Sequence, residues 1–198
     1  MFIITNRFFG GKTMPKIIEN LTDDILAKAA GIIENDGIEK LSIRRLSSDL
    51  GIAASTIYNY YDGKEALINA AAMKKWEETL AGIDEICSSD SDVIEILSMI
   101  TDRIRVFFRP FFLYHISYVN KNEKGGKTIP DHPLEYRNTI YSQLGSRVEG
   151  LLKSRGYTED DAGEMATVLT KLTVLTMHGD DVGMEDIVRV IKKLIQAV

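Results

Sequence analysis

The stretch Leu41–Leu67, LSIRRLSSDLGIAASTIYNYYDGKEAL, decides the fold of this chain. Ser42 is a favoured helix-capping residue and Gly51 a common helix terminator, so we expect a short helix over Ile43–Leu50. A second short helix is expected over Ala54–Tyr61, because an Asp-Gly pair follows it. Two short helices joined by a glycine turn are typical of a helix-turn-helix.

The second of these helices is expected to have one buried face and one exposed face. Ile57 and Tyr61 are four residues apart and share the face that packs inward. Hydroxyls, an amide and phenols occupy the exposed positions Ser55, Thr56, Tyr58, Asn59 and Tyr60. Such groups can reach base edges and phosphates in a DNA major groove. A single exposed tyrosine is more often ordinary surface, but here the surrounding pattern favours DNA contact.

Basic residues flank this helix on both sides. Arg44, in the first turn of the preceding helix, is the best-placed guanidinium for a guanine edge or a phosphate. Lys64 opens the following helix, where its charge and a free backbone N–H favour a phosphate. The net charge of the whole chain is −5, which argues against a general nucleic-acid binder. Residues 40–64, however, carry four basic against two acidic side chains, a local basic patch.

The rest of the chain also has helical periodicity. It contains only four prolines and no convincing alternation typical of strands. A first helix is expected from an N-cap at Thr22 to Gly37, and Thr158 begins a capping box. Further helices are expected over residues 64–86, 93–108, 111–119, 134–152, 159–178 and 184–198, with an interruption at Pro110 and a loop over 120–133. The sequence therefore predicts an all-α protein of about nine helices.

These residues resemble the tetracycline-repressor (TetR) family of bacterial transcription regulators. The resemblance covers about residues 22 to 70 and rests on a combined pattern. That pattern comprises Gly37, Leu41-Ser42-Ile43-Arg44, Gly51-Ile52, Thr56-Ile57-Tyr58, Tyr61 and Lys64-Glu65-x-Leu67. It implies phosphate contacts from Tyr58, Tyr60 and Lys64. Residues nearest the bases would be Arg44, Ser55, Thr56 and Asn59, with Ser42 and Ala54 on the same interface.

Three positions depart from the family pattern. Ala53 stands where Ser or Thr usually caps the third helix, which costs that helix about 1 kcal/mol. Arg45 stands where the family often has an acid, and Ser47 where it often has alanine. With Ala53 and Ala54 together, few side chains remain to read bases, although an alanine can contact a thymine methyl.

The resemblance also implies a domain order. We expect an N-terminal extension over 1–20, a helix-turn-helix domain over 21–66, and an effector-binding and dimerisation domain over 67–198. One interpretation is that the residues before Met14 are disordered or are not translated, with Met14 as the functional start. The alternative is a basic N-terminal arm that contacts the DNA phosphates. Residues 162–177 have apolar groups on more than one face, so a partner chain is the simplest cover. A homodimer through the last two helices would match a palindromic operator on double-stranded DNA.

A dense aromatic segment, residues 107–118, is the candidate effector site. An aromatic stripe at helical spacing is more often core than pocket, so both readings stay open. An apolar cavity with a few convergent polar groups is the usual small-molecule site. The candidate lining residues are Trp76, Met99, Arg103, Phe107, Phe111, Tyr114, His115 and Tyr118.

Other functional classes find little support. We find no nucleotide-binding glycine loop, zinc motif or catalytic triad, so no enzyme activity, cofactor or metal is expected. No apolar run is long enough to span a bilayer, so we expect no membrane contact. Cys87 is the single cysteine, which suits a cytoplasmic protein. We expect a dimeric repressor that a small-molecule effector releases from its operator, with an activator left open. The alternative is a helical ligand-binding protein or enzyme with a vestigial DNA-binding head.

Overall fold

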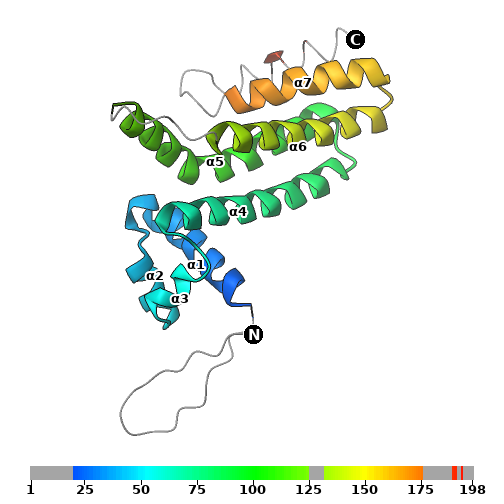
Figure 1. The fold of residues 1–198 in the computed structure, drawn as a ribbon. Helices are drawn as coiled ribbons and strands as arrows, with labels where there is room; N and C mark the ends of the chain where they lie inside the picture. Colours follow the sequence, from blue (N-terminus) through cyan, green and yellow to red (C-terminus); the bar gives the residue numbers. More distant parts are fainter. Residues whose placement is uncertain (1–19, 125–131, 176–188, 191–192, 194–198) are drawn as a thin grey trace, which may run out of the picture. The chain divides into compact units, whose positions relative to one another are not determined.

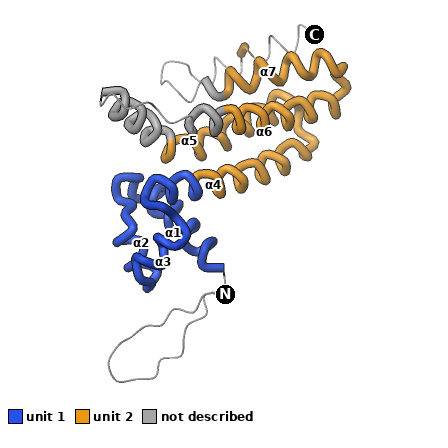
Figure 2. Tube along the Cα trace, viewed as in Figure 1, with its two compact units in different colours: residues 1–71 blue, residues 72–198 orange. Residues whose placement is uncertain are grey.

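The computed structural model describes residues 20–124, 132–175, 189–190 and 193, and describes side chains for all of these except 112–124, 132–137 and 174–175. Its elements are seven α-helices and one 3-10 helix (Figure 1). The prediction of an all-α protein is confirmed. Two compact units divide the chain at residues 71 and 72, within α4 (Lys64–Cys87), as Figure 2 shows.

The first unit begins with α1 (Leu21–Asp36), followed by a short 3-10 helix, η1 (Ile38–Lys40). The expected N-cap at Thr22 is wrong, because the helix already includes Leu21 and its N-cap is Asn20. Leu21 is buried, so packing draws the chain into helix earlier than the capping preference alone would. The helix ends before Gly37, as predicted, since φ there is +89°, a value that favours glycine.

The helix α2 (Ile43–Leu50) has the predicted bounds. The Ser42 hydroxyl oxygen accepts a hydrogen bond from the Arg45 backbone N–H at 3.1 Å, which satisfies one free donor of the first turn. Gly51 closes the helix with φ at +66°. Ile43 and Leu46 are buried, and they pack in the core of the unit with Ile57 of the next helix.

The helix α3 (Ala54–Tyr58) is shorter than the predicted 54–61. The backbone N–H groups of Tyr60 and Tyr61 both donate to the Ile57 carbonyl, each at 3.0 Å, so the last turn tightens and stops. Its N-cap, Ala53, supplies no side-chain hydrogen bond. An uncapped helix of five residues has too few internal hydrogen bonds to extend further.

The second unit is built from the rest of α4, α5 (Val93–Lys124), α6 (His132–Ser154) and α7 (Glu159–Leu175). Figure 1 shows α6 and α7 side by side over most of their length. Each helix contributes an apolar stripe to one core. The most deeply buried large residues of this unit are Trp76, Ile83, Ile96, Ile100, Ile104 and Leu144.

The predicted interruption at Pro110 is wrong, because α5 continues through it. Proline removes one backbone donor and ordinarily breaks or kinks a helix. Phe107, three residues before the proline, and Phe111, directly after it, are both buried with ring centroids 5.7 Å apart. Burial of these two rings offsets the lost hydrogen bond and holds the helix together.

The connection between α6 and α7 is short. Gly156 has φ at +94°, and Tyr157 donates its backbone N–H to the Leu152 carbonyl at 3.2 Å. Thr158 accepts from the Asp161 backbone N–H at 3.2 Å, as expected of the capping box. Three expected segments lie outside the described residues: positions 1–19 of the extension predicted over 1–20, the predicted helix end near His178, and most of the predicted final helix at 184–198. Among the helices described, none combines the length and apolar character of a membrane span.

Candidate nucleic-acid interface

The first unit presents a polar face on α2, α3 and the start of α4. Tyr58 is 56% exposed and Tyr60 is 37% exposed, whereas Ile57 is fully buried. The helices α2 and α3 pack against each other, which brings their exposed residues onto one part of the unit. Of the other predicted DNA contacts, Ser42, Arg44, Ser55 and Asn59 are exposed, and Ala54, Thr56 and Lys64 are half-buried.

Two neighbouring arginines have different surroundings. Arg45 forms ion pairs with Asp36, at the end of α1, and with Asp49, one turn further along α2. Asp49 also pairs with Lys28 of α1 at 3.5 Å, so the four charges link α1 to α2. Arg44 is exposed and makes no ion pair with any residue that the structure describes. Of these two arginines, Arg44 is therefore the one whose guanidinium is available to a ligand.

The arginine and serine departures from the family pattern have structural explanations. Arg45 also donates to the Lys40 carbonyl at 3.4 Å, so it contacts η1 as well as both helices. The buried Ser47 hydroxyl donates to the Arg44 carbonyl at 2.9 Å, which satisfies it within α2. Neither residue requires DNA to satisfy its polar group.

The three clustered tyrosines differ in surroundings. Tyr61 is half-buried rather than a core residue, and its ring lies 6.5 Å from that of Tyr60. Burial raises the pKa of the Tyr61 phenol, and the charges of Asp23 and Tyr60 raise it further. The Tyr61 phenol therefore stays protonated at neutral pH, while Tyr58 and Tyr60 extend toward solvent.

The predicted effector residues are only partly brought together. Trp76 is fully buried and its ring lies 5.2 Å from that of Phe107, which in turn stacks on Phe111. The Trp76 indole N–H donates to the Gln143 side-chain oxygen at 2.7 Å. These three rings form a contiguous part of the core.

Met99 and Arg103 do not lie with these rings. Both are exposed, and the Arg103 guanidinium donates to the Glu78 carbonyl of α4 at 3.4 Å. It lies against Gly82, where an added Cβ would come within 2.5 Å of it. Tyr114, His115 and Tyr118 fall on α5, but their side chains lie outside the described residues.

A polar connection between α4 and α6 was not anticipated from the sequence. The Arg147 guanidinium binds both carboxylate oxygens of Asp84, at 2.7 and 3.0 Å, and also donates to the Gln143 carbonyl. Together with the Trp76–Gln143 hydrogen bond, the Arg147–Asp84 ion pair joins α4 to α6 at two positions along the helices. The partners are more than 60 residues apart in sequence, so no local pattern could pair them.

Nearby, Cys87 is half-buried at the end of α4. Burial raises the pKa of its thiol, and the Asp84 carboxylate raises it further, while Arg147 acts in the opposite direction. The thiol is therefore mostly protonated at neutral pH and a weak nucleophile.

Comparisons with known proteins agree with this geometry. Residues 25–71 match the family described as "Bacterial regulatory proteins, tetR family". Over 140 residues the chain is 29% identical to the uncharacterized HTH-type transcriptional regulator YvdT of Bacillus subtilis (strain 168), covering 70% of this chain and 69% of that protein.

Solved structures share the fold. A transcriptional regulator from Cytophaga hutchinsonii ATCC 33406 superimposes with a TM-score of 0.63 at 18% identity, covering 90% of this chain and 96% of that one. A TetR transcriptional regulator from Legionella pneumophila gives 0.58 at 17% identity, covering 90% and 98%. The fold is that of helix-turn-helix transcriptional regulators. Within it, residues 25–71 of the first unit are similar to the TetR family.

Proposed function

We propose that the chain is a homodimeric repressor that binds a palindromic DNA operator in the cytoplasm and leaves it when a small molecule binds the second unit. The observation that carries this is the division of α3, where Ile57 is fully buried and Tyr58 is 56% exposed. A helix of five residues has room for one buried face only. Its opposite face is therefore available to a major groove.

The proposed contacts follow from exposure and chemistry. Tyr58, Tyr60 and Lys64 donate to phosphates and fix the position of α3 on the duplex. The guanidinium of Arg44 is free to bind a guanine edge or a phosphate. Ser42 lies beside it, and Ala54, Ser55, Thr56 and Asn59 lie nearest the bases.

The proposed domains are residues 21–66 for DNA binding and 67–198 for effector binding and dimerisation. A two-fold dimer would place two copies of α3 in major grooves a whole number of helical turns apart. Val168, 43% exposed on α7, supports a partner on that helix.

Phosphate contacts can be tested without knowing the operator, because they do not depend on sequence. The double variant Tyr58→Phe with Lys64→Ala should weaken binding to a random-sequence duplex in a filter-binding assay. Loss of one lysine–phosphate contact should also reduce the slope of log affinity against log salt by about 0.9 per subunit.

A matched control makes the same chemical changes in the second unit. Tyr157→Phe with Lys171→Ala should leave affinity and salt slope unchanged. The proposed interface is wrong if both double variants bind DNA as the unmodified protein does. A protein that binds no DNA at all would instead support the ligand-binding alternative.

A further inference from the structure

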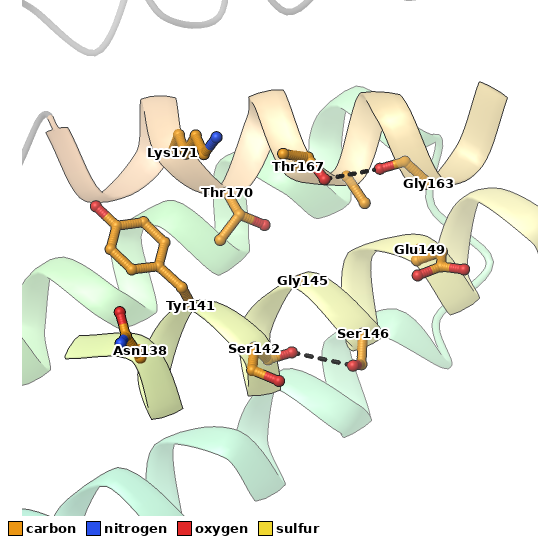
Figure 3. Close-up of a pocket in the computed structure, with 11 residues that line it drawn as sticks. Asn138, Tyr141, Ser142, Gly145, Ser146, Glu149, Gly163, Thr167, Thr170 and Lys171 are labelled. Carbon is orange, nitrogen blue, oxygen red and sulfur yellow. Dashed lines mark hydrogen bonds between the residues drawn. The ribbon is translucent and has the colours of Figure 1, made fainter. Parts of the chain in front are cut away.

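A groove of about 670 Å³ lies between α6 and α7 and is separate from the aromatic cluster. Small residues form its floor, among them Gly145, Gly163 and Ala166. The volume is in the range of sites that hold drug-sized molecules. Figure 3 shows the groove following the two helices, with Tyr141 and Lys171 at one end and Glu149 at the other.

A buried hydroxyl in this groove has no partner. Thr170 is 3% exposed, and its Oγ1 makes no hydrogen bond with any described residue. Figure 3 shows its side chain projecting from α7 toward α6, into the groove. An added Cβ at Gly145 would lie 3.8 Å from this oxygen, an ordinary van der Waals contact, so with glycine at this position no side-chain atom of residue 145 covers the hydroxyl. Because an unpaired buried hydroxyl costs free energy, a ligand acceptor at this point would be strongly favoured.

Two other hydroxyls of the groove are already engaged as donors. Ser146 donates to the Ser142 carbonyl, and Thr167 to the Gly163 carbonyl, each at 3.0 Å (Figure 3). Within the described part of the groove, Thr170 is therefore the hydroxyl donor that is buried and unused.

The charges at the two ends are not equivalent. Glu149 shares its ion-pair partner Lys153 with Glu159, at 2.9 and 3.0 Å, so one positive charge faces two negative charges at this end. Lys171 is exposed and makes no ion pair with any residue that the structure describes. The Tyr141–Lys171 end is thus net positive and suits an anion.

We propose that this groove binds a monocarboxylic acid with an unbranched apolar tail. The carboxylate lies at the Tyr141–Lys171 end and accepts a hydrogen bond from Thr170, while the tail lies over Gly145, Ala166 and Gly163. Tyr141 and Glu149 are eight residues apart, which at about 1.5 Å per residue gives a groove about 12 Å long. A ten-carbon acid matches that length.

Binding of this ligand would change the contacts of α4 indirectly, through α6. Gln143 and Arg147, which bind Trp76 and Asp84 of α4, alternate along α6 with the groove residues Ser142 and Ser146. A ligand that turns α6 therefore alters its contacts with α4. That the ligand acts as an effector rests on the proposed function, whereas its binding does not.

The site can be tested by calorimetric titration of the full chain. The ligands are sodium decanoate and, as its cationic counterpart, decylammonium, both below their micellar concentrations. Decanoate should bind once per chain and decylammonium at least about tenfold more weakly. Thr170→Val should weaken decanoate about tenfold and also raise the thermal midpoint of the ligand-free protein, because it removes the unpaired hydroxyl. Lys171→Gln should weaken binding several-fold, whereas Arg105→Gln, which removes a charge elsewhere in the unit, should not.

Steric variants provide an independent test. Gly145→Leu fills the groove and should abolish binding, while Gly145→Ala adds only an ordinary contact and should retain it. The proposal is overturned if decanoate does not bind the unmodified chain. It is also overturned if Gly145→Leu and Thr170→Val both bind decanoate as tightly as the unmodified chain does. A fall in the sedimenting mass of Gly145→Leu also overturns it, because the groove would then be an interface between two copies.

The regulatory part is tested separately by adding decanoate to the protein–DNA complex. Release of DNA supports the effector role. Binding in calorimetry without release of DNA contradicts that role and leaves the site established, whereas failure to bind DNA without ligand contradicts the proposed function alone.

Discussion

Arg44 and Arg45 are adjacent in the sequence but have different surroundings. Arg45 is committed to Asp36 and Asp49, while Arg44 is exposed on the next position of the helix. We expect Arg44→Ala to weaken DNA binding by about 1–3 kcal/mol with little change in the free energy of unfolding. Arg45→Ala should instead lower the free energy of unfolding by about 1 kcal/mol, since its ion pairs are partly exposed.

Urea unfolding followed by circular dichroism, with filter binding to DNA, measures both quantities. Arg45→Lys is the control, because it keeps one charge but not the planar donor set. Equal effects of Arg44→Ala and Arg45→Ala on stability would contradict this division between the two arginines.

Cys87 offers a prediction that depends on pH. Because burial and Asp84 raise its thiol pKa, the thiolate fraction at neutral pH is lower than in an unfolded chain. Iodoacetamide should therefore alkylate the folded protein more slowly than the urea-unfolded protein, and the difference should shrink as pH rises through the folded pKa. Asp84→Asn removes one cause of the shift and should accelerate the reaction. Folded and unfolded chains that react at equal rates would contradict the raised pKa.

At the scale of the element, α3 is the least supported helix in the first unit. Its N-cap is Ala53, whose side chain accepts no hydrogen bond, and it spans five residues. Ala53→Ser should supply an acceptor to the first turn and raise the free energy of unfolding by about 1 kcal/mol. Urea unfolding measures the change, and Ala53→Val, which lacks the acceptor and is as poor an N-cap as alanine, is the control. A serine variant no more stable than the valine variant would show that capping does not limit α3.

Helices were predictable where local signals act alone. The bounds of α2 follow from Ser42 and Gly51, because a cap and a glycine with positive φ both act within one turn. The course of α5 through Pro110 was not predictable, because Phe107 and Phe111 are stabilised by a core assembled from distant residues. At both Pro110 and Leu21, burial in the core outweighs the local preference of the sequence for ending or starting a helix.

The candidate sites were likewise predictable only where the signal is local to one helix. The exposed positions Tyr58 and Asn59 could be assigned from a single helix and its periodicity. The exposure of Met99 and Arg103 could also have been anticipated, since they lie roughly 60–100° from the centre of the buried stripe of α5. The groove at Thr170 could not, because its two walls are joined only in the folded unit.

At the scale of the whole molecule, the proposed dimer makes one direct prediction. Val168 is 43% exposed on α7 and does not line the groove between α6 and α7. Val168→Asp would place an unpaired charge in the proposed interface and raise the dimer dissociation constant at least about tenfold. Sedimentation equilibrium measures the association.

The matched control is Val106→Asp, because Val106 is 74% exposed on α5. It carries the same substitution on a valine outside the proposed interface and should leave the mass measured by sedimentation equilibrium unchanged. If both variants, or neither, alter the mass, α7 is not the dimer contact. Loss of the dimer should also weaken operator binding, since two linked heads bind more tightly than one.

Trp76 is the single tryptophan of the 198-residue chain, and it is fully buried in the second unit. Its intrinsic fluorescence therefore reports the environment of that unit alone, through its contacts with Gln143 and Phe107. Ellipticity, by contrast, averages the helices of both units. If the first unit unfolds before the second, ellipticity will fall while the emission maximum stays at short wavelength. The chain thus carries a built-in optical probe that can distinguish the melting of one unit from that of the other without a label.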